Sequence, residues 1–275
     1  MFRVKKALNN NTVIAIGADN QEYLLIGKGI GFGKKVSQRI EASEGCMIYS
    51  LFEYTERGSA MDLVKGIDPV FLEIAEQVLK EGERVFGRID WSILFPMADH
   101  IAFAVKRIQG GEQISNPLTG DIQALFHMEY NAAACIRPIL KERLGVEIDE
   151  HEIGYIALHI HSAIENENVA LSMRIAGTVR ECIQLVEERT GRTIDVMSLT
   201  YNRLMNHVRY MVARVLKGEE LKLDMNDYIS ENFPDAFKLS EIVCGHMERY
   251  LKKPVNDVEI GYLAMHIQRV LAELE

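Results

Sequence analysis

The sequence predicts a multidomain protein in which a small antiparallel β-sheet domain precedes two homologous all-α helical-bundle domains. The first observation is a change of hydrophobic period near residue 68, from short runs typical of strands to three- and four-residue steps typical of helices. The second is an internal repeat at an offset of 107 residues in the helical part. We therefore expect domains at 1–57, 61–168 and 169–275.

The first 55 or so residues favour a small antiparallel sheet. Asn9, Asn10 and Asn11 separate the first two strands, and asparagine tolerates the backbone conformations of tight turns. Because so short a segment has little core of its own, dimerisation would stabilise it. The segment 55–66 is a plausible linker. The expected strands lie at 2–8, 12–17, 22–27 and 47–52.

Capping residues mark where the helices begin. Asp68 followed by Pro69 fits an N-cap and a first helical position, and Asp90 is placed to cap the next helix. Asp149, with Glu152 three residues later, forms a variant capping box at the start of a further helix. We expect helices from about residue 68 to the end.

The repeat is clearest in two nine-residue segments. Residues 152–160 and 259–267 agree at seven of nine positions. The same offset superimposes His100 on His207 and His159 on His266, whereas the other four histidines have no counterpart. Retention of two histidines per copy, while much of the surrounding sequence diverges, indicates that imidazole chemistry matters. Those without a counterpart are His127, His151, His161 and His246.

Reversible phosphorylation fits these histidines better than metal binding or nucleophilic catalysis. Neither copy offers third and fourth metal ligands at a familiar spacing, His151-Glu152 is not part of an HExxH motif, and no nucleophile motif is present. Neutral imidazole is nucleophilic near pH 7. Arg107 and Arg214, seven residues after His100 and His207, are placed to meet a phosphate. His100 lies off the apolar face of its helix, so we expect a half-exposed site or a partner interface rather than a core position. No catalytic residue, metal or cofactor is expected.

Charge, cysteine content and hydropathy limit the class of protein further. Residues 1–40 carry seven Lys or Arg against two acids, a sum of +5, so the other 235 residues sum to −14 within the net −9. A basic head on an acidic body is consistent with a polyanionic partner, although an ordinary solvated surface is also possible. The four cysteines form no CxxC pair, which favours a reducing cytoplasm. No run of about 18 apolar residues occurs, so no membrane insertion is expected.

A glycine-rich segment at 27–35 does not match a nucleotide-binding signature. It fits neither the Walker pattern nor GxGxxG. It is either a floppy hairpin connection or a nucleic-acid contact loop. In the second case Lys28, Lys34 and Lys35 would meet phosphates and Phe32 would stack on a base.

The Asn-Asn-Asn turn, the segment Gly-Lys-Gly-Ile-Gly-Phe-Gly-Lys-Lys and the two repeats with paired histidines together resemble the BglG/SacY family of bacterial sugar-operon transcription antiterminators. The resemblance covers the whole chain and looks closest to the glucose-operon branch. It implies an N-terminal RNA-binding domain that dimerises, binds a leader-mRNA hairpin (the ribonucleic antiterminator) and so blocks an overlapping terminator. The residues implied to contact RNA are Lys6, Asn11, Gly27, Lys28 and Phe32.

The resemblance also implies control by the sugar phosphotransferase system (PTS). His100 and His159 would be phosphorylated by the sugar permease EII, which would inactivate the protein. His207 and His266 would be phosphorylated by the phosphocarrier protein HPr. Asn206 replaces the aspartate seen at Asp99, so the two copies are expected to differ as phosphate acceptors.

Two other functions remain open at this stage. A phosphohistidine relay protein of the PTS would transfer phosphate onward, but would leave the basic head without a role. A DNA-binding regulator with the same regulatory domains should begin with a helix-turn-helix, which the strand-like N-terminus does not favour.

Overall fold

The computed structural model of this 275-residue chain describes residues 1–42, 45–51, 54–55, 58–59, 66–165, 169–191, 193–194 and 198–273. The chain forms two compact units, Met1–Ser115 with Met128–Glu167 and Asn116–His127 with Asn168–Glu275. Across the described ranges, none of the helices is both long and apolar enough to cross a lipid bilayer.

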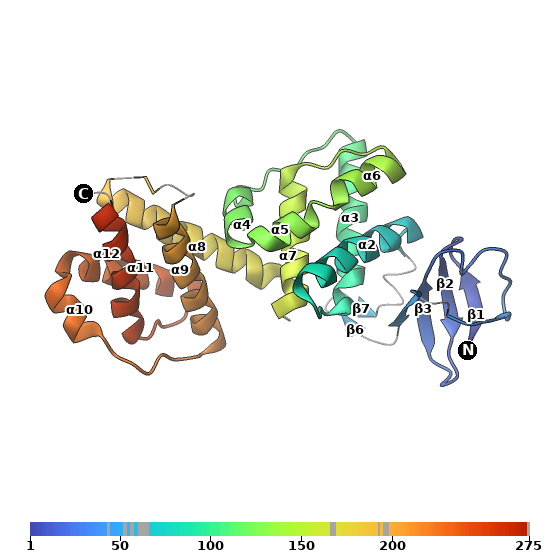
Figure 1. Cartoon of the computed structure of the whole chain (residues 1–275), viewed down its shortest axis with the longest axis horizontal. Coiled ribbons are helices and arrows are strands. Elements are labelled where there is room, and N and C mark those ends of the chain that lie inside the picture. The colour runs from blue at the N-terminus through green and yellow to red at the C-terminus, as the bar shows by residue number, and fades with distance from the viewer. Residues whose placement is uncertain are drawn as a thin grey trace. The chain divides into compact units, whose positions relative to one another are not determined.

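The N-terminal strands form the predicted antiparallel sheet, drawn in blue in Figure 1. It has five strands in the order β4-β1-β2-β3-β5, and each neighbouring pair is antiparallel. A separate pair, β6-β7, falls within the predicted linker, most of which lies outside the described residues. The strands are β1 (Phe2–Ala7), β2 (Thr12–Ile16), β3 (Glu22–Ile26), β4 (Arg39–Ile40), β5 (Met47–Ser50), β6 (Tyr54–Thr55) and β7 (Gly58–Ser59).

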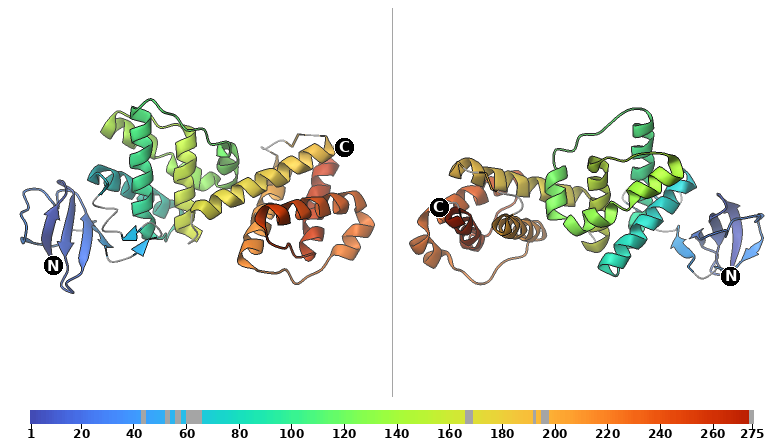
Figure 2. Two further views of the ribbon diagram at one scale, coloured as in Figure 1. Left: turned by 180° about the vertical axis from the view of Figure 1, so that it is seen from behind. Right: turned by 45° about the horizontal axis from the view of Figure 1, so that its top comes forward.

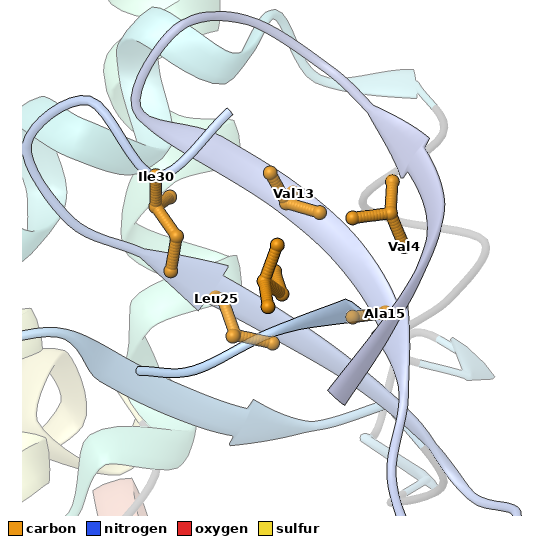
Figure 3. Close-up of a cluster of buried hydrophobic side chains, with 6 residues drawn as sticks. Val4, Val13, Ala15, Leu25 and Ile30 are labelled. Carbon is orange, nitrogen blue, oxygen red and sulfur yellow. The ribbon is translucent and has the colours of Figure 1, made fainter. Parts of the chain in front are cut away.

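A small apolar cluster holds this sheet together (Figure 3). Ile30 comes from the glycine-rich segment and is only 7% exposed, so burial of this side chain anchors the segment against the sheet. The cluster consists of Val4, Val13, Ala15, Leu25, Ile30 and Ile40.

The helices of the first unit begin at the predicted caps. The side chains of Asp68, Asp90 and Asp149 accept backbone hydrogen bonds of 2.9 Å. Asp90 caps a short 3₁₀ turn, η1 (Trp91–Ile93), directly before the long helix that the pattern predicted. The helices are α2 (Pro69–Phe86), α3 (Leu94–Gln109), α5 (His127–Ala133), α6 (Ile136–Leu144) and α7 (Glu150–Glu165).

Every regular element described in the second unit is a helix, and the unit is drawn mainly in yellow to red in Figure 2. Helices α11 and α12 pack against each other, α9 packs on α12, and α8 packs on α9 and α11. The short α4, from the first repeat, packs on α8 and α9. The helices are α4 (Thr119–Leu125), α8 (Val169–Thr190), α9 (Leu199–Lys217), α10 (Asn226–Asn232), α11 (Pro234–Leu251) and α12 (Val258–Glu273).

Candidate functional site

Backbone hydrogen bonds hold the glycine-rich segment against the asparagine turn. Asn11 accepts from Gly27 N through its backbone carbonyl and from Gly29 N through its side-chain Oδ1, both at 2.8 Å. Gly31 N donates to the Asn10 carbonyl at 2.9 Å. The floppy hairpin connection is therefore the wrong alternative for this segment, because the segment is fixed at three points.

Two glycines are required by this geometry. A Cβ atom at Gly31 would lie 2.2 Å from the backbone oxygen of Asn9, well inside contact distance. Gly29 has φ +71°, a conformation that other residues adopt at a cost. These positions let the two segments approach closely.

Lys28 and Phe32 project from this paired surface. Lys28 is exposed, and the Phe32 side chain is 71% exposed although it is large and apolar. The structure thus brings four of the five predicted RNA contacts, Asn11, Gly27, Lys28 and Phe32, into one loop cluster. The fifth, Lys6, is exposed on β1, opposite Ile14 of β2.

A buried carboxylate of α2, which sequence reasoning missed, occupies the asparagine turn. Glu73 accepts from Asn9 Nδ2 at 2.6 Å, from Asn11 Nδ2 at 3.3 Å and from Thr12 Oγ1 at 3.4 Å. Arg143 of α6 donates to the same carboxylate at 2.7 Å. No local motif marks Glu73, because its partners lie more than 60 residues away in the sequence.

The first predicted histidine pair lies between α3 and α7. The ring centroids of His100 and His159 are 5.4 Å apart, and the Tyr155 ring is 5.5 Å from that of His100. His100 keeps 19% of its side chain exposed, whereas His159 is 8% exposed. His100 is therefore the more accessible of the two, although it is less exposed than the half-exposed position predicted for it.

The second pair lies between α9 and α12 and is packed more tightly. The rings of His207 and His266 stack with centroids 4.4 Å apart, and Tyr262 stacks on His207 at 6.5 Å. Burial, helped by His266 and Arg214, lowers the pKa of His207 to about 3. Burial also lowers the pKa of His266, with contributions from Arg269 and Arg203. Both rings are therefore neutral at pH 7.

Each pair has a buried glutamate beside it, and the two glutamates are bound differently. Glu152 contacts Arg107 Nη2 at 2.5 Å through one oxygen and His100 Nε2 at 3.2 Å through the other. Burial raises the pKa of Glu152, but the contacts with His100 and Arg107 outweigh it, so the pKa lies below its usual value.

Glu259 gives both oxygens to Arg214, at 2.7 and 2.8 Å. Arg107 and Arg214, expected as phosphate partners, thus hold carboxylates in this structure. Glu152 was interpreted only as a capping residue, although its place at the head of the repeated nine-residue segment could have identified it.

No group of three or more His, Cys, Asp or Glu side chains suited to a metal ion occurs among the described residues. Each of the two sites instead combines a pair of imidazoles with one carboxylate and one guanidinium. Such a set can accept, hold and charge-balance a phosphoryl group.

Comparison with known proteins gives matches over nearly the whole chain. Residues 2–57 match the CAT RNA binding domain model, and residues 73–163 and 180–270 each match the PRD domain model. The two PRD matches fall on the two sequence repeats.

Three relatives are similar to this chain over almost their whole length. Protein GlcT of Staphylococcus haemolyticus is 31% identical, over 97% of this chain and 95% of its own length. The PtsGHI operon antiterminator of Bacillus subtilis is 33% identical, over 98% of this chain and 97% of its own. The β-glucoside operon antiterminator of Dickeya chrysanthemi is 26% identical, over 100% and 98%.

A solved structure is also similar. The crystal structure of GlcT CAT-PRDI aligns with a TM-score of 0.51 and 37% identity, and covers 59% of this chain and 98% of the solved chain. This solved chain, GlcT CAT-PRDI, is named for the same two kinds of domain that the family models match at residues 2–57 and 73–163 of the present chain.

Proposed function

The chain belongs to the family of transcription antiterminators that join a CAT RNA binding domain to two PRD domains, and we propose that it binds a leader-mRNA hairpin as a homodimer. Its relatives are regulators of sugar operons rather than enzymes. The bound hairpin would prevent an overlapping terminator from forming, so that the polymerase continues into the operon.

The observation that carries the RNA proposal is the cluster made by the asparagine turn and the glycine-rich loop. Lys28 is exposed there and would contact phosphate, and Phe32 offers an exposed ring on which an unpaired base can stack. Lys6, Asn11 and Gly27 complete the proposed contact set. Because this position holds a lysine, Lys28 would act as a point charge. An arginine at the same position could make a bidentate hydrogen bond to a base or a phosphate.

The described N-terminal residues favour RNA over duplex DNA. Residues 2–26 form three strands joined by turns, and no recognition helix occurs in residues 1–42 that could enter a major groove. A phosphate relay would need none of this basic loop cluster.

We propose that the histidine pairs receive the regulatory signal. His100 and His159 would accept phosphate from a PTS permease EII, with loss of activity, and His207 and His266 would accept it from HPr. Two rings within 5.4 Å on neighbouring helices, repeated in both copies, support this assignment. Each phosphorylation adds a charge of about −2.

Charge repulsion gives the inhibition a physical basis. In a two-fold dimer a phosphohistidine near the axis occurs twice, and two such charges ~10 Å apart repel by roughly 1–2 kcal/mol in water. About 1.4 kcal/mol changes an equilibrium tenfold, which is enough to shift a balanced dimer.

The proposal also includes the domain bounds and the location of the protein. We propose that it acts in the cytoplasm, where transcripts are made, and that its domains span 1–57, 61–168 and 169–275.

Acidic substitutions test the inhibitory mechanism. We expect the doubly substituted H100D/H159D protein to bind leader RNA at least tenfold more weakly than the wild type and to dimerise less, by filter binding and analytical ultracentrifugation. His127→Asp, at a histidine without a counterpart in the repeat, serves as the control. Wild-type affinity and dimerisation in H100D/H159D would refute the mechanism.

A filter-binding comparison of leader RNA with duplex DNA distinguishes an RNA-binding antiterminator from a DNA-binding regulator.

A further inference from the structure

The two repeats differ in how a buried glutamate meets the first histidine of each pair. Glu152 is 1% exposed and divides its oxygens between Arg107 and His100. Glu259 is also 1% exposed, but Arg214 takes both of its oxygens. Both His100 Nε2 and His207 Nε2 are buried without a hydrogen bond of good geometry among the described residues, but His100 Nε2 lies 3.2 Å from a Glu152 oxygen, whereas both Glu259 oxygens are taken by Arg214.

We infer that Glu152 is a positioning residue that makes His100 Nδ1 the atom that accepts the phosphoryl group. The inference rests on the proposed phosphorylation of His100. A carboxylate has no proton to donate, so the neutral imidazole that faces it carries its proton on Nε2 and leaves the lone pair on Nδ1. Nε2 lies 3.2 Å from the Glu152 oxygen, and although this contact lacks full hydrogen-bond geometry in the structure, a carboxylate charge at that distance favours the proton on Nε2.

Electrostatics points to the same nitrogen. His100 Nε2 is buried against Glu152, so a phosphoryl group on this atom would have to displace the carboxylate and would meet its negative charge at close range. Nδ1 is the ring nitrogen that does not face the carboxylate. The partly exposed side of His100 therefore provides the route for a donor.

During the phosphoryl transfer, Glu152 stays beside His100 Nε2, the nitrogen that does not react. The Nδ1 lone pair forms the new N–P bond as the bond between phosphorus and the phosphorylated side chain of the donor breaks, and the electron pair of that bond returns to the donor side chain. The Nε2 proton stays in place, so the His100 ring becomes an imidazolium. Glu152 stabilises this developing charge, as a carboxylate behind a catalytic histidine does.

The second repeat provides a matched comparison. Glu259 is equally buried and also paired with an arginine, but Arg214 takes both of its oxygens. In the part of the chain that the structure describes, no carboxylate is therefore placed to select the tautomer of His207. Glu152→Gln and Glu259→Gln each remove one buried charge beside an arginine, but only Glu152→Gln removes a carboxylate from a histidine.

The first experiment measures the tautomer without any phosphate donor. The full-length protein is labelled with ¹⁵N-histidine, and His100 is assigned from the His100→Gln spectrum. We expect the Nε2–H tautomer in the wild type. In Glu152→Gln the amide oxygen stays with Arg107 and the NH₂ group turns to His100, so the tautomer should change to Nδ1–H. Glu259→Gln should leave the His207 tautomer unchanged.

The second experiment identifies the phosphorylated nitrogen. After incubation with phosphoenolpyruvate, enzyme I, HPr and a permease, the His100 peptide is isolated and its phosphohistidine isomer is determined by ³¹P NMR. We expect the Nδ1 isomer in the wild type, at least tenfold slower labelling in Glu152→Gln, and partial recovery in Glu152→Asp. Glu152→Asp also keeps the test valid if Glu152→Gln does not fold.

The outcomes separate the inference from the proposed function. An Nε2 isomer at His100 in the wild type, or wild-type tautomer and rate in Glu152→Gln, would overturn the role of Glu152 while leaving regulation by phosphorylation intact. Absence of phosphate on His100 with every donor would overturn the proposed function instead, and the tautomer measurement would still decide whether Glu152 orients the ring.

Discussion

Burial of His207 ties the stability of the second unit to pH. The pKa of His207 lies near 3 in the folded protein, against about 6.5 when unfolded, because the ring is buried beside His266 and Arg214. The unfolded state therefore binds the proton more readily, and stability falls as pH drops below 6.5. Between pH 6.5 and pH 5 this group alone should cost roughly 1–2 kcal/mol.

Urea denaturation at both pH values checks this effect in the wild type and in His207→Gln. The variant should lose less stability than the wild type over the same interval, by roughly 1–2 kcal/mol. The comparison isolates His207 from His266, whose pKa is also lowered and which remains in both proteins. Equal losses in the two proteins would show that His207 is protonated as easily when folded as when unfolded.

Phe32 is the residue whose exposure is hardest to explain without a ligand. Its ring is 71% exposed, so Phe32→Ala removes little packing and should leave the fold and the dimer unchanged. A stacked base is worth about 1–3 kcal/mol, so RNA affinity should fall by about 5- to 150-fold. Filter binding and circular dichroism measure the two quantities. Leu223→Ala, at a comparably exposed side chain of the helical body, is the control, and an unchanged Phe32→Ala affinity would place the RNA elsewhere.

The carboxylate of Glu73 in helix α2 is expected to compete with RNA for the asparagine turn. It accepts hydrogen bonds from Asn9 and Asn11, in the same turn that holds the glycine-rich loop, so RNA phosphates that approach Asn11 meet a negative charge. Glu73→Gln removes this charge, and Arg143 remains solvated because its side chain is 27% exposed. We expect RNA to bind the variant about fivefold more tightly, equivalent to ~1 kcal/mol.

Glu81→Gln provides the control for that measurement on the same helix, since Glu81 pairs with Arg84 on the exposed side of α2. It should leave RNA affinity unchanged. Weaker RNA binding by Glu73→Gln, in a protein with unaltered circular dichroism, would mean that Glu73 supports the binding conformation of the turn rather than competing with RNA.

The elements themselves were largely predictable because their signals are local. Four strands (β1, β2, β3 and β5), the caps at Asp68 and Asp90 and the repeated helices follow from alternation, capping residues and period. The short β4 was not predicted, since two residues paired with β1 carry no periodic signal.

The loop cluster and the histidines could be identified from sequence, but their carboxylate partners could not. The backbone bonds from Gly27 and Gly29 to Asn11 require the sheet to be folded first. Glu152 is 45 residues from Arg107 in the sequence, and only the packing of α7 on α3 brings them together. Burial and pairing over such separations leave no pattern in a single sequence, except where a repeat displays the same residue twice.

The uneven charge of the whole chain makes RNA binding measurably dependent on salt. The basic first 40 residues sum to +5, and the rest of the chain to −14, so phosphate contacts should be confined to the N-terminal sheet. Each contact releases counterions, and log K falls with log salt by about 0.7–0.9 per phosphate neutralised. Lys28→Gln should therefore reduce the slope, while Lys238→Gln, on the exposed surface of α11, should not.

The size of that reduction also reports the assembly, because a homodimer on one hairpin brings Lys28 to the RNA twice. A monomer would lose about 0.7–0.9 from the slope and a dimer about 1.4–1.8. Affinities of full-length wild type, Lys28→Gln and Lys238→Gln between 50 and 300 mM KCl give the three slopes directly. A loss near 1.6 with Lys28→Gln and none with Lys238→Gln fits two basic sheets on one transcript. Equal slopes in all three proteins would remove Lys28 from the RNA contact, and a loss near 0.8 would mean that one protomer binds alone.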